Sequence, residues 1–320
     1  MEYKNITDVK KPVSRIVFGT AAPAMVRGEN VFKLLDEVFA AGVNTFDTAR
    51  SYGLAEKSLG AWMAARDNRD KIVLLAKGAH PLSGSQEARV TPEAVREDVE
   101  KSLAMLNTSF LDIYMLHRDN PKTSVGPLVE TLNELREEGK IGVFGGSNWS
   151  YERIDEANEY AYAHDMFGFD VSSPAYSLAE QKEDPWGGCV DISGARHSAE
   201  RSWYQDKGVE VFAYASLGHG FLSGKFRANE EKRAAKLLDA YAVKGYFCRE
   251  NFERLARAER LAGRKRATVP QIALAWLLQQ PLNPMAICSA SAAKRMLSNL
   301  KALDLDLSAE ELDWLSNGDH

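Results

Sequence analysis

Short apolar runs alternate with amphipathic segments along most of the chain. Eight of these runs have the length and the Val, Ile, Phe and Tyr content typical of buried strands. Most are followed by a segment with apolar residues at i, i+3, i+4 and i+7, the spacing of a helix with one buried face. The predicted strands are 15–20, 44–49, 72–77, 110–117, 141–147, 169–176, 209–216 and 284–290. Eight strand and helix pairs predict an α/β protein with a (β/α)8 TIM barrel.

The helix boundaries carry their own signals. The clearest amphipathic segments are 30–42, 91–106, 126–140 and 268–280. Thr91 is expected to cap the second of these helices, with Pro92 at its first position. Gly42 and Gly139 stand where two helices are expected to end. The predicted helix boundaries therefore do not depend on apolar periodicity alone.

No linker rich in Gly, Pro or Ser divides the sequence, so residues 1–320 are predicted to form a single barrel domain. The polar N-terminal segment is expected to form a small hairpin. Two irregular stretches, 177–197 and 226–251, follow the sixth and seventh predicted strands. Both are expected at the C-terminal face of the barrel, where active sites are built, as long loops forming walls or lids of a substrate pocket.

Composition narrows the classes of function. The 320 residues include 40 Lys and Arg against 45 Asp and Glu, giving a net charge of −5. This balance gives no field to attract nucleic acid or an anionic membrane, so a small-molecule substrate is expected. No apolar run approaches the roughly 18 residues of a membrane span. The three cysteines lack disulfide or zinc spacing, and a cytoplasmic location is predicted.

Polar residues stand at the ends of three consecutive predicted strands. Asp47 ends the second strand, Lys77 the third and His117 the fourth, while Tyr52 follows in the loop after Asp47. Each residue alone has an ordinary structural interpretation, as a cap, a rim charge, a hydrogen-bonded histidine or a loop aromatic. In a barrel the three strand ends converge on one rim, so the four groups can share a site.

Together these groups suit proton transfer. A buried ammonium favours the phenolate form of a neighbouring tyrosine, and a carboxylate behind it keeps the lysine charged. A neighbouring imidazole can orient a carbonyl oxygen and assist the proton. The four side chains are therefore suited to protonating a carbonyl oxygen that gains negative charge.

Over nearly its whole length the chain resembles the aldo-keto reductase family. The stretches "FDTARSYG", "LLAKG" and "YMLHRD" match the family's tetrad motifs in the expected order. The resemblance implies a (β/α)8 barrel that uses a nicotinamide cofactor and no metal. It also implies that Tyr52 is the general acid, that Lys77 lowers its pKa, that Asp47 supports Lys77, and that His117 orients the substrate carbonyl.

The resemblance also implies a cofactor site. The Ser-Asn pair of "GGSNW" grips the nicotinamide carboxamide, the tyrosine of "FAYASLGHGFLSGK" stacks on the nicotinamide, and "SASAAKRMLSNL" contacts the adenosine end. The implied cofactor contacts are Gly19, Thr20, Asp47, Ser147, Asn148, Ser173, Tyr214, Ala215, Ser216, Leu217, Gly218, Gly220, Lys225, Ser289, Ser291, Arg295 and Asn299. NADPH is the expected cofactor, with NADH possible.

Three positions depart from the family pattern. Ser173 stands where Gln is usual, so its reach toward the cofactor is shorter. Ser289 replaces the frequent Lys or Gly of the adenosine loop, which leaves the contact to the 2′-phosphate open. Ala76 precedes Lys77 where Thr is common, a change without an obvious effect on the chemistry.

Other signals are weaker. The stretch "GHGFLSGKF" lacks the spacing of a phosphate-binding P-loop, and no GxGxxG opens a helix after the first strand. The remaining histidines have no metal-ligand spacing, so no metal is expected. Trp149 and Trp186 are candidate walls of the substrate pocket. Their rings can stack on a sugar face or fill the core of their own loops.

The predicted function is NAD(P)H-dependent reduction of an aldehyde or ketone, or the reverse oxidation of an alcohol or sugar. The alternative is a cofactor-binding regulatory subunit, resembling the channel-associated members of the family, with slow turnover. A metal-dependent barrel hydrolase is a third interpretation, but the sequence lacks ligands for it.

Overall fold

The computed structural model describes residues 1–85 and 87–319. Eight parallel strands form a closed barrel in the order β10-β3-β4-β5-β6-β7-β8-β9, which confirms the predicted (β/α)8 fold. The barrel strands are β3 (Ile16–Gly19), β4 (Thr45–Asp47), β5 (Val73–Gly78), β6 (Leu111–Leu116), β7 (Ile141–Ser147), β8 (Val171–Ser173), β9 (Glu210–Ala213) and β10 (Met285–Cys288). Each lies inside or within one residue of a predicted strand.

By its internal contacts the described chain separates into two compact units. Unit 1 comprises Met1–Ser173, Gly208–Glu210 and Ser289–Ala293, and unit 2 comprises Pro174–Lys207, Val211–Cys288 and Lys294–His320. Each is described by itself below, and the organisation as a single domain stays a prediction.

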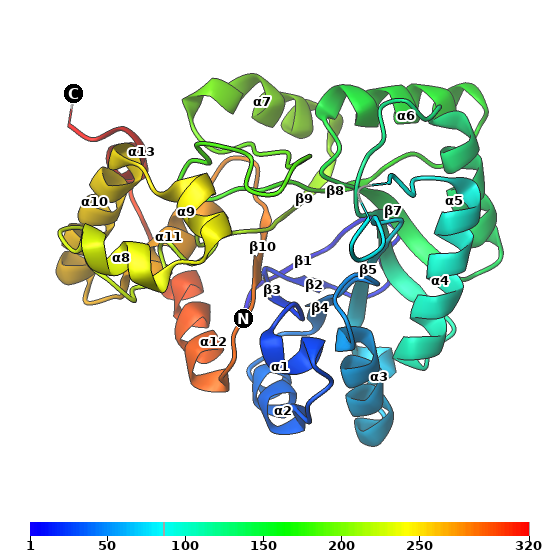
Figure 1. Cartoon of the computed structure of the whole chain (residues 1–320), viewed down its shortest axis with the longest axis horizontal. Coiled ribbons are helices and arrows are strands. Elements are labelled where there is room, and N and C mark those ends of the chain that lie inside the picture. Colours follow the sequence, from blue (N-terminus) through cyan, green and yellow to red (C-terminus); the bar gives the residue numbers. More distant parts are fainter. Residues whose placement is uncertain (86, 320) are drawn as a thin grey trace. The chain divides into compact units, whose positions relative to one another are not determined.

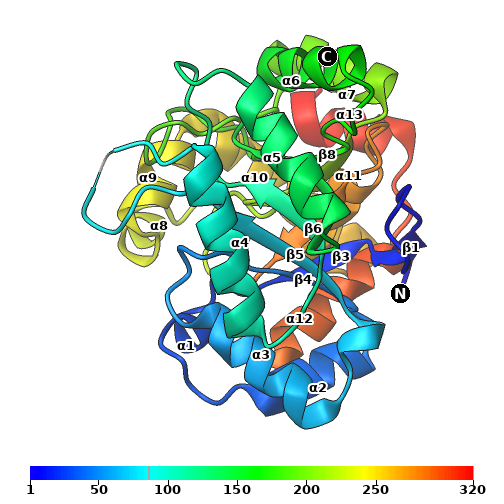
Figure 2. The ribbon, with the colours of Figure 1, turned by 90° about the vertical axis from the view of Figure 1, so that its right-hand side faces the viewer.

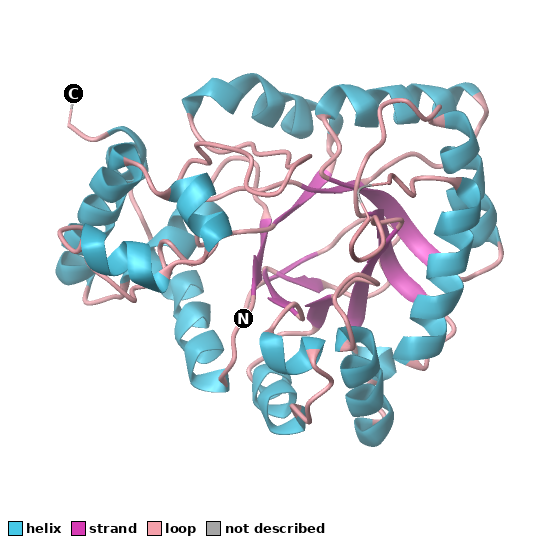
Figure 3. Ribbon diagram, viewed as in Figure 1, coloured by secondary structure: helices cyan, strands magenta, loops and turns pink. Residues whose placement is uncertain are grey.

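Unit 1 contains strands β3 to β8 with their helices on the outer side (Figure 3). Its helices are α1 (Pro23–Val26), α2 (Phe32–Ala40), α3 (Ala55–Arg66), η1 (Arg69–Lys71), α4 (Pro92–Leu106), α5 (Gly126–Glu137) and α6 (Tyr151–Ala163). Helices α3, α4, α5 and α6 pack against one another in sequence order (Figure 2). The expected N-terminal hairpin is present as β1 (Tyr3–Lys4) and β2 (Val13–Ser14), which pair antiparallel.

The strand register of unit 1 places the C-terminal ends of β3, β4 and β5 next to one another. Asp47 on β4 pairs with Leu75 on β5, and Gly19 on β3 pairs with Asp47. Lys77 lies two residues beyond Leu75 on the same strand, so its side chain points to the same face as that of Leu75. A carboxylate and an ammonium from adjacent strands are therefore neighbours.

The predicted helix signals of unit 1 are confirmed at both ends. Thr91 caps α4 by accepting a hydrogen bond from the Ala94 amide, and Pro92 is the first helical residue. Gly42 and Gly139 have φ values of 97° and 71° after α2 and α5. Backbone of this left-handed kind suits glycine, which has no side chain to clash.

Unit 2 contains the two long loops and the C-terminal helices (Figure 1). Its helices are η2 (Ala195–His197), α7 (Ser198–Lys207), α8 (Glu231–Leu237), α9 (Ala240–Tyr246), α10 (Arg249–Lys265), α11 (Val269–Leu278), α12 (Ala293–Leu300, from Lys294 onward), η3 (Lys301–Asp304) and α13 (Ala309–Asn317). The prediction of an irregular stretch at 226–251 was wrong, because α8 and α9 lie within it. Each has only seven residues, which is too short for a clear helical period.

Candidate active site

Asp47 and Lys77 form a buried ion pair in unit 1. The Lys77 ammonium contacts Oδ1 of Asp47, and the two side chains are 3% and 4% exposed. Buried charges are stable only when they are paired and hydrogen-bonded. The pair is therefore a fixed element at the ends of β4 and β5.

Tyr52 and His117 lie beside this pair. The Lys77 Nζ is 5.6 Å from the centroid of the Tyr52 ring, and the Tyr52 and His117 ring centroids are 5.6 Å apart with their planes at 82°. The His117 amide donates to the Gly78 carbonyl at 2.8 Å, which fixes its backbone against β5. The structure thus brings together all four residues that the sequence predicted to share a site.

Burial dominates the protonation states of this cluster. It lowers the pKa of Lys77 to about 7, whereas the contact with the Asp47 carboxylate favours the charged form. The pKa of His117 lies well below its ordinary value, because the ring is desolvated and cations lie nearby. The imidazole is therefore neutral at pH 7, with its Nδ1 3.3 Å from the Ser51 hydroxyl.

The expected lowering of the Tyr52 pKa is not found. Desolvation of the phenol raises the Tyr52 pKa to about 12. The cation that opposes this rise is Arg118 rather than Lys77. The physical reason is that burial of the phenol penalises its charged form more than nearby cations favour it. At neutral pH the phenol carries its proton, which is the form that a general acid needs.

Ser147 and Asn148 lie at the end of β7, next to His117. The Ser147 hydroxyl donates to the Ser173 carbonyl at 3.1 Å, and the Asn148 amide nitrogen donates to Ser147 Oγ at 3.1 Å. The same nitrogen lies 3.5 Å from the His117 carbonyl oxygen. Asn148 has φ 59°, a left-handed conformation that asparagine tolerates. This pair can present an amide and a hydroxyl to a carboxamide ligand.

Two glycines allow β7 to approach its neighbours. A Cβ at Gly145 would lie 1.7 Å from the Val171 carbonyl oxygen on β8, and one at Gly146 would lie 2.5 Å from the Trp149 ring. Neither position has room for a side chain. The close approach brings Ser147 within hydrogen-bonding distance of Ser173.

On the other side of Asp47, the β3 end carries Gly19 and Thr20. The Thr20 amide donates to the Asp47 carbonyl at 2.9 Å, and its buried hydroxyl has no partner within the described residues. The Ser289 hydroxyl donates to the Gly19 carbonyl at 2.8 Å. An unpaired buried hydroxyl beside the tetrad fits a polar ligand group there, and a contact of Thr20 to the cofactor stays a prediction.

In unit 2, residues 214–220 form a tight loop after β9. Ala215, Gly218, His219 and Gly220 have φ values of 50°, 58°, 51° and 94°. The Gly218 and Gly220 amides donate to the Ala215 and Leu217 carbonyls at 2.7 and 3.2 Å, so internal hydrogen bonds close these turns. The Ser216 hydroxyl donates to the carbonyls of Ala213 and Ile287 and so anchors the loop. Binding of a cofactor pyrophosphate by this loop stays a prediction.

The predicted adenosine-end residues differ in their surroundings. Asn299 is buried on α12, whereas Arg295 on the same helix is exposed. Ser289 and Ser291 in unit 1 and Lys225 in unit 2 are exposed as well. The Ser289 hydroxyl already donates to the Gly19 carbonyl. Contacts of these residues to a cofactor stay predictions.

The two tryptophans have different environments. Trp149 is fully buried in unit 1, where its ring lies 5.1 Å from Phe169 and its Nε1 donates to the Arg118 carbonyl at 3.0 Å. This favours the interpretation that Trp149 fills a core. Trp186 in unit 2 is half-buried beside Tyr214, with ring centroids 6.2 Å apart, and also contacts Tyr241 at 5.6 Å.

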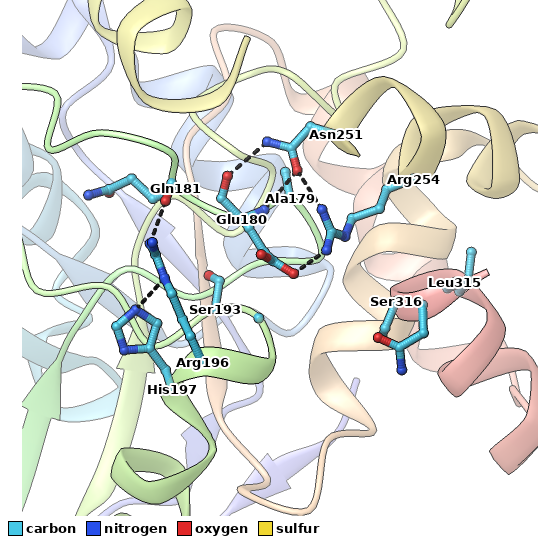
Figure 4. Close-up of polar contacts among 12 residues, drawn as sticks. Ala179, Glu180, Gln181, Ser193, Arg196, His197, Asn251, Arg254, Leu315 and Ser316 are labelled. Atoms are coloured by element: carbon cyan, nitrogen blue, oxygen red, sulfur yellow. Dashed lines mark hydrogen bonds and ion pairs between the residues drawn. The ribbon is translucent and has the colours of Figure 1, made fainter. Parts of the chain in front are cut away.

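The long loop after β8 is tied to α10 within unit 2 (Figure 4). The Glu180 amide donates to Asn251 Oδ1 at 2.9 Å, and Asn251 Nδ2 donates to the Glu180 carbonyl at 2.8 Å. The Glu180 carboxylate also forms an ion pair with Arg254. Further along, Arg196 donates to the Gln181 carbonyl at 2.6 Å. The loop is irregular as predicted, yet its backbone is held by the side chains of Asn251 and Arg196.

Sequence reasoning missed two residues beside the tetrad. His80 follows Lys77 by three residues, and its ring centroid is 4.9 Å from that of His117. Arg118 follows His117 directly and is half-buried. Their positions next to two predicted site residues are the signal that could have drawn attention to them.

Within residues 1–85 and 87–319, no group of three His, Cys, Asp or Glu side chains is arranged to hold a metal ion. The same residues contain no helix that is both long and apolar enough to cross a membrane. Cys189, Cys248 and Cys288 are free thiols.

Comparison with known proteins gives consistent matches. The profile of the Aldo/keto reductase family matches residues 15–317. Aldo-keto reductase str7 of Strobilurus tenacellus is 27% identical over 286 residues, which cover 88% of this chain and 78% of that protein. The NADH-specific methylglyoxal reductase of Escherichia coli (strain K12) is 28% identical over 291 residues, covering 85% and 82%. Norsolorinic acid reductase B of Dothistroma septosporum is 26% identical over 294 residues, covering 89% and 71%.

Proposed function

Because the chain belongs to the aldo/keto reductase family and is an oxidoreductase, we propose that it reduces an aldehyde or ketone with Tyr52 as the general acid. The observation that carries this proposal is the cluster of Tyr52 and His117 beside the buried Lys77–Asp47 pair. It combines a protonated phenol, a neutral imidazole and a fixed charge pair within one unit.

A nicotinamide cofactor, when bound, would supply the hydride and be oxidised. Tyr52 would give its phenolic proton to the carbonyl oxygen of the substrate as that oxygen gains negative charge. His117 is neutral, so it can donate a hydrogen bond to the same oxygen and orient it. The Lys77 ammonium stabilises the tyrosinate that remains, and the phenol regains its proton from solvent. The product is the alcohol.

The proposed cofactor contacts are taken unit by unit. In unit 1, Ser147 and Asn148 would bind the carboxamide. In unit 2, Tyr214 would stack on the nicotinamide and the loop at Leu217 and Gly218 would bind the pyrophosphate. The left-handed turns of that loop and the hydrogen-bonded Ser-Asn pair support this assignment. The preferred cofactor is NADPH, with Arg295 contacting its 2′-phosphate and NADH as a weaker alternative.

The test is a panel of aldehydes, ketones and polyols with NADPH and NADH, followed by nicotinamide absorbance. The wild type is compared with Lys77→Met and with Lys101→Met, whose lysine is exposed on α4. We expect turnover by the wild type and Lys101→Met and a loss of at least about 10²-fold for Lys77→Met. Equal rates for all three proteins would refute the assignment. Tight cofactor binding without turnover of any compound would instead support the regulatory alternative.

A further inference from the structure

The loop that carries Tyr52 joins β4 to α3 within unit 1, and a charged residue stands on each side of it. Arg50 precedes Tyr52 in the loop, and Glu56 follows it in the first turn of α3. The Arg50 guanidinium donates a hydrogen bond from Nη1 to Glu56 Oε2 and forms an ion pair with this carboxylate. The pair closes residues 50–56 into a loop with Tyr52 inside it.

The carboxylate of this pair is fixed from its other side as well. Glu56 is 1% exposed, and its Oε1 accepts a hydrogen bond of 2.7 Å from the buried Ser102 hydroxyl on α4. Burial raises the pKa of the Glu56 carboxyl, while the hydrogen bonds from Ser102 and Arg50 favour its charged form. Arg50, Glu56 and Ser102 thus form a clamp that anchors the loop to α3 and α4.

The backbone of the same loop is anchored to β5. The Arg50 amide donates to the Lys77 carbonyl at 2.9 Å, and the Tyr52 amide donates to the Ala49 carbonyl at 3.0 Å. Arg50 therefore contacts β5 through its backbone and α3 through its side chain. Loss of the side-chain contact would free the segment on which Tyr52 is mounted.

The loop also reaches the second proposed catalytic group. Ser51 lies between Arg50 and Tyr52, and its hydroxyl is 3.3 Å from His117 Nδ1. His117 is neutral, so its ring carries one proton. When the Ser51 hydroxyl donates to Nδ1, that proton is on Nε2, which can then donate to a carbonyl oxygen.

We propose that Arg50 and Glu56 are positioning residues of the reductase site, whose ion pair, anchored by Ser102, holds Tyr52 and the contact of Ser51 with His117 in place. This inference rests on the proposed reductase function and adds the residues that fix its proton donor. Both side chains act through the loop rather than on the reactants. A misplacement of about 1 Å can cost roughly 10²-fold in rate, so such a clamp can control kcat.

Three changes remove or alter the clamp. Arg50→Met leaves the buried Glu56 carboxylate without its ion-pair partner, which can destabilise the fold strongly. The double variant Arg50→Met/Glu56→Met removes both charges, and replacement of a buried pair by apolar side chains is often tolerated. Arg50→Lys keeps a cation without the planar guanidinium.

The matched control is Arg69→Met. Arg69 pairs with Asp112, and their side chains are 24% and 3% exposed, close to the 20% and 1% of Arg50 and Glu56. Arg69 lies on η1 and Asp112 on β6, so this pair is outside the loop of Tyr52. The control therefore removes a similarly buried ion pair of unit 1 without altering the clamp.

The assays are kcat and KM for an aldehyde that the wild type reduces, with rates normalised to folded protein, and the Kd of the cofactor. Arg50→Met and the double variant should lower kcat about 10- to 100-fold, while the Kd of the cofactor stays close to that of the wild type. Arg50→Lys should recover part of the lost kcat. Arg69→Met should unfold at lower denaturant concentration and retain its kcat.

A double-mutant cycle tests whether Arg50 acts through Tyr52. Tyr52→Phe has no phenolic proton left to position, so adding Arg50→Met to it should lower kcat much less than Arg50→Met alone. The ¹⁵N chemical shifts of the His117 imidazole, assigned by comparison with His117→Gln, give a readout without turnover. They should change in the double variant Arg50→Met/Glu56→Met and stay unchanged in Arg69→Met.

Four outcomes would each overturn the inference. These are a wild-type kcat in the double variant, an equal loss of kcat in Arg50→Met and Arg69→Met, additive losses in the cycle with Tyr52→Phe, and unchanged His117 shifts in the double variant. Failure of the proposed function looks different, because Tyr52→Phe would then retain the wild-type rate. A slow Tyr52→Phe beside a double variant with wild-type kcat refutes only the positioning role.

Discussion

The substitution Tyr52→Phe removes one oxygen from the proposed centre and little else. The ring contacts with His117 and Lys77 involve the face and edge of the aromatic ring, and phenylalanine retains them. Cofactor affinity should therefore stay close to that of the wild type. Any large effect on rate then reports the lost proton donor.

The expected loss of rate follows from the role of the phenol. Desolvation raises the Tyr52 pKa to about 12, so the wild-type residue is protonated over the whole neutral range. A positioned general acid raises the reaction rate about 10²–10⁴-fold, which corresponds to roughly 2.7–5.4 kcal/mol of transition-state stabilisation. The assay is kcat and KM for an aldehyde that the wild type reduces, with Tyr162→Phe as the control. Tyr162 lies on α6 and is 64% exposed.

The same substitution should also change how the free energy of unfolding depends on pH, independently of catalysis. The Tyr52 pKa is raised from 10.0 to about 12 in the folded protein. Above pH 10 the unfolded chain loses this proton while the folded protein keeps it, so the contribution of Tyr52 to stability falls as pH rises from about 10 to about 12. The full effect is about 2.7 kcal/mol, with about 1.4 kcal/mol lost by pH 11. Tyr52→Phe lacks this alkaline loss.

Denaturant unfolding at pH 8, 9, 10 and 11 measures the free energy of unfolding for wild type and both variants. The difference between wild type and Tyr52→Phe should be constant at pH 8 and 9 and then shift by about 1.4 kcal/mol in favour of the variant at pH 11. A flat difference would contradict the burial argument. A wild-type rate for Tyr52→Phe would refute the assignment of the acid, whatever the stability data show.

Three further predictions concern other parts of the molecule. Lys77→Met and Asp47→Asn should each slow turnover, and the double variant should lose much less than the combined single losses, because the pair acts as one unit; additive losses in kcat/KM would refute this. Arg295→Ala should weaken NADPH by roughly 1.5–3 kcal/mol in KM and leave NADH almost unchanged, and equal effects on both cofactors would show that Arg295 does not contact the phosphate. Asn251→Ala should lower the free energy of unfolding by about 1–3 kcal/mol in thermal or denaturant unfolding, since the half-buried Glu180 backbone groups lose their partners, and an unchanged free energy would argue against these hydrogen bonds between loop and helix.

Much of unit 1 could be predicted because its local signals agree with each other. The run at 141–147 forms β7 over the same residues, and Thr91 with Pro92 starts α4 as expected. The pairing of Asp47 with Lys77 follows from the order of strands in a barrel alone. Apolar periodicity and caps are local properties, so they can be recognised in one sequence.

The remaining features depend on the folded environment. The Tyr52 pKa is set by how much water the fold removes from the phenol, and no spacing in the sequence reports that quantity. The same holds for Arg118, which is half-buried and whose guanidinium has no carboxylate partner within the described residues. Partners 30 or more residues away decide such properties, as Arg153 does by taking Asp119.

The two glycines of β7 also limit which sequences this barrel end can accept. A methyl group at position 145 would lie 1.7 Å from a carbonyl oxygen of the neighbouring strand, and one at position 146 would overlap the Trp149 ring. Neither glycine needs to touch a reactant to be indispensable. In a saturation library sorted for activity both positions would be depleted as strongly as Tyr52. In a library sorted for folded protein they would still be depleted whereas Tyr52 would tolerate replacement, which separates steric constraint from chemistry.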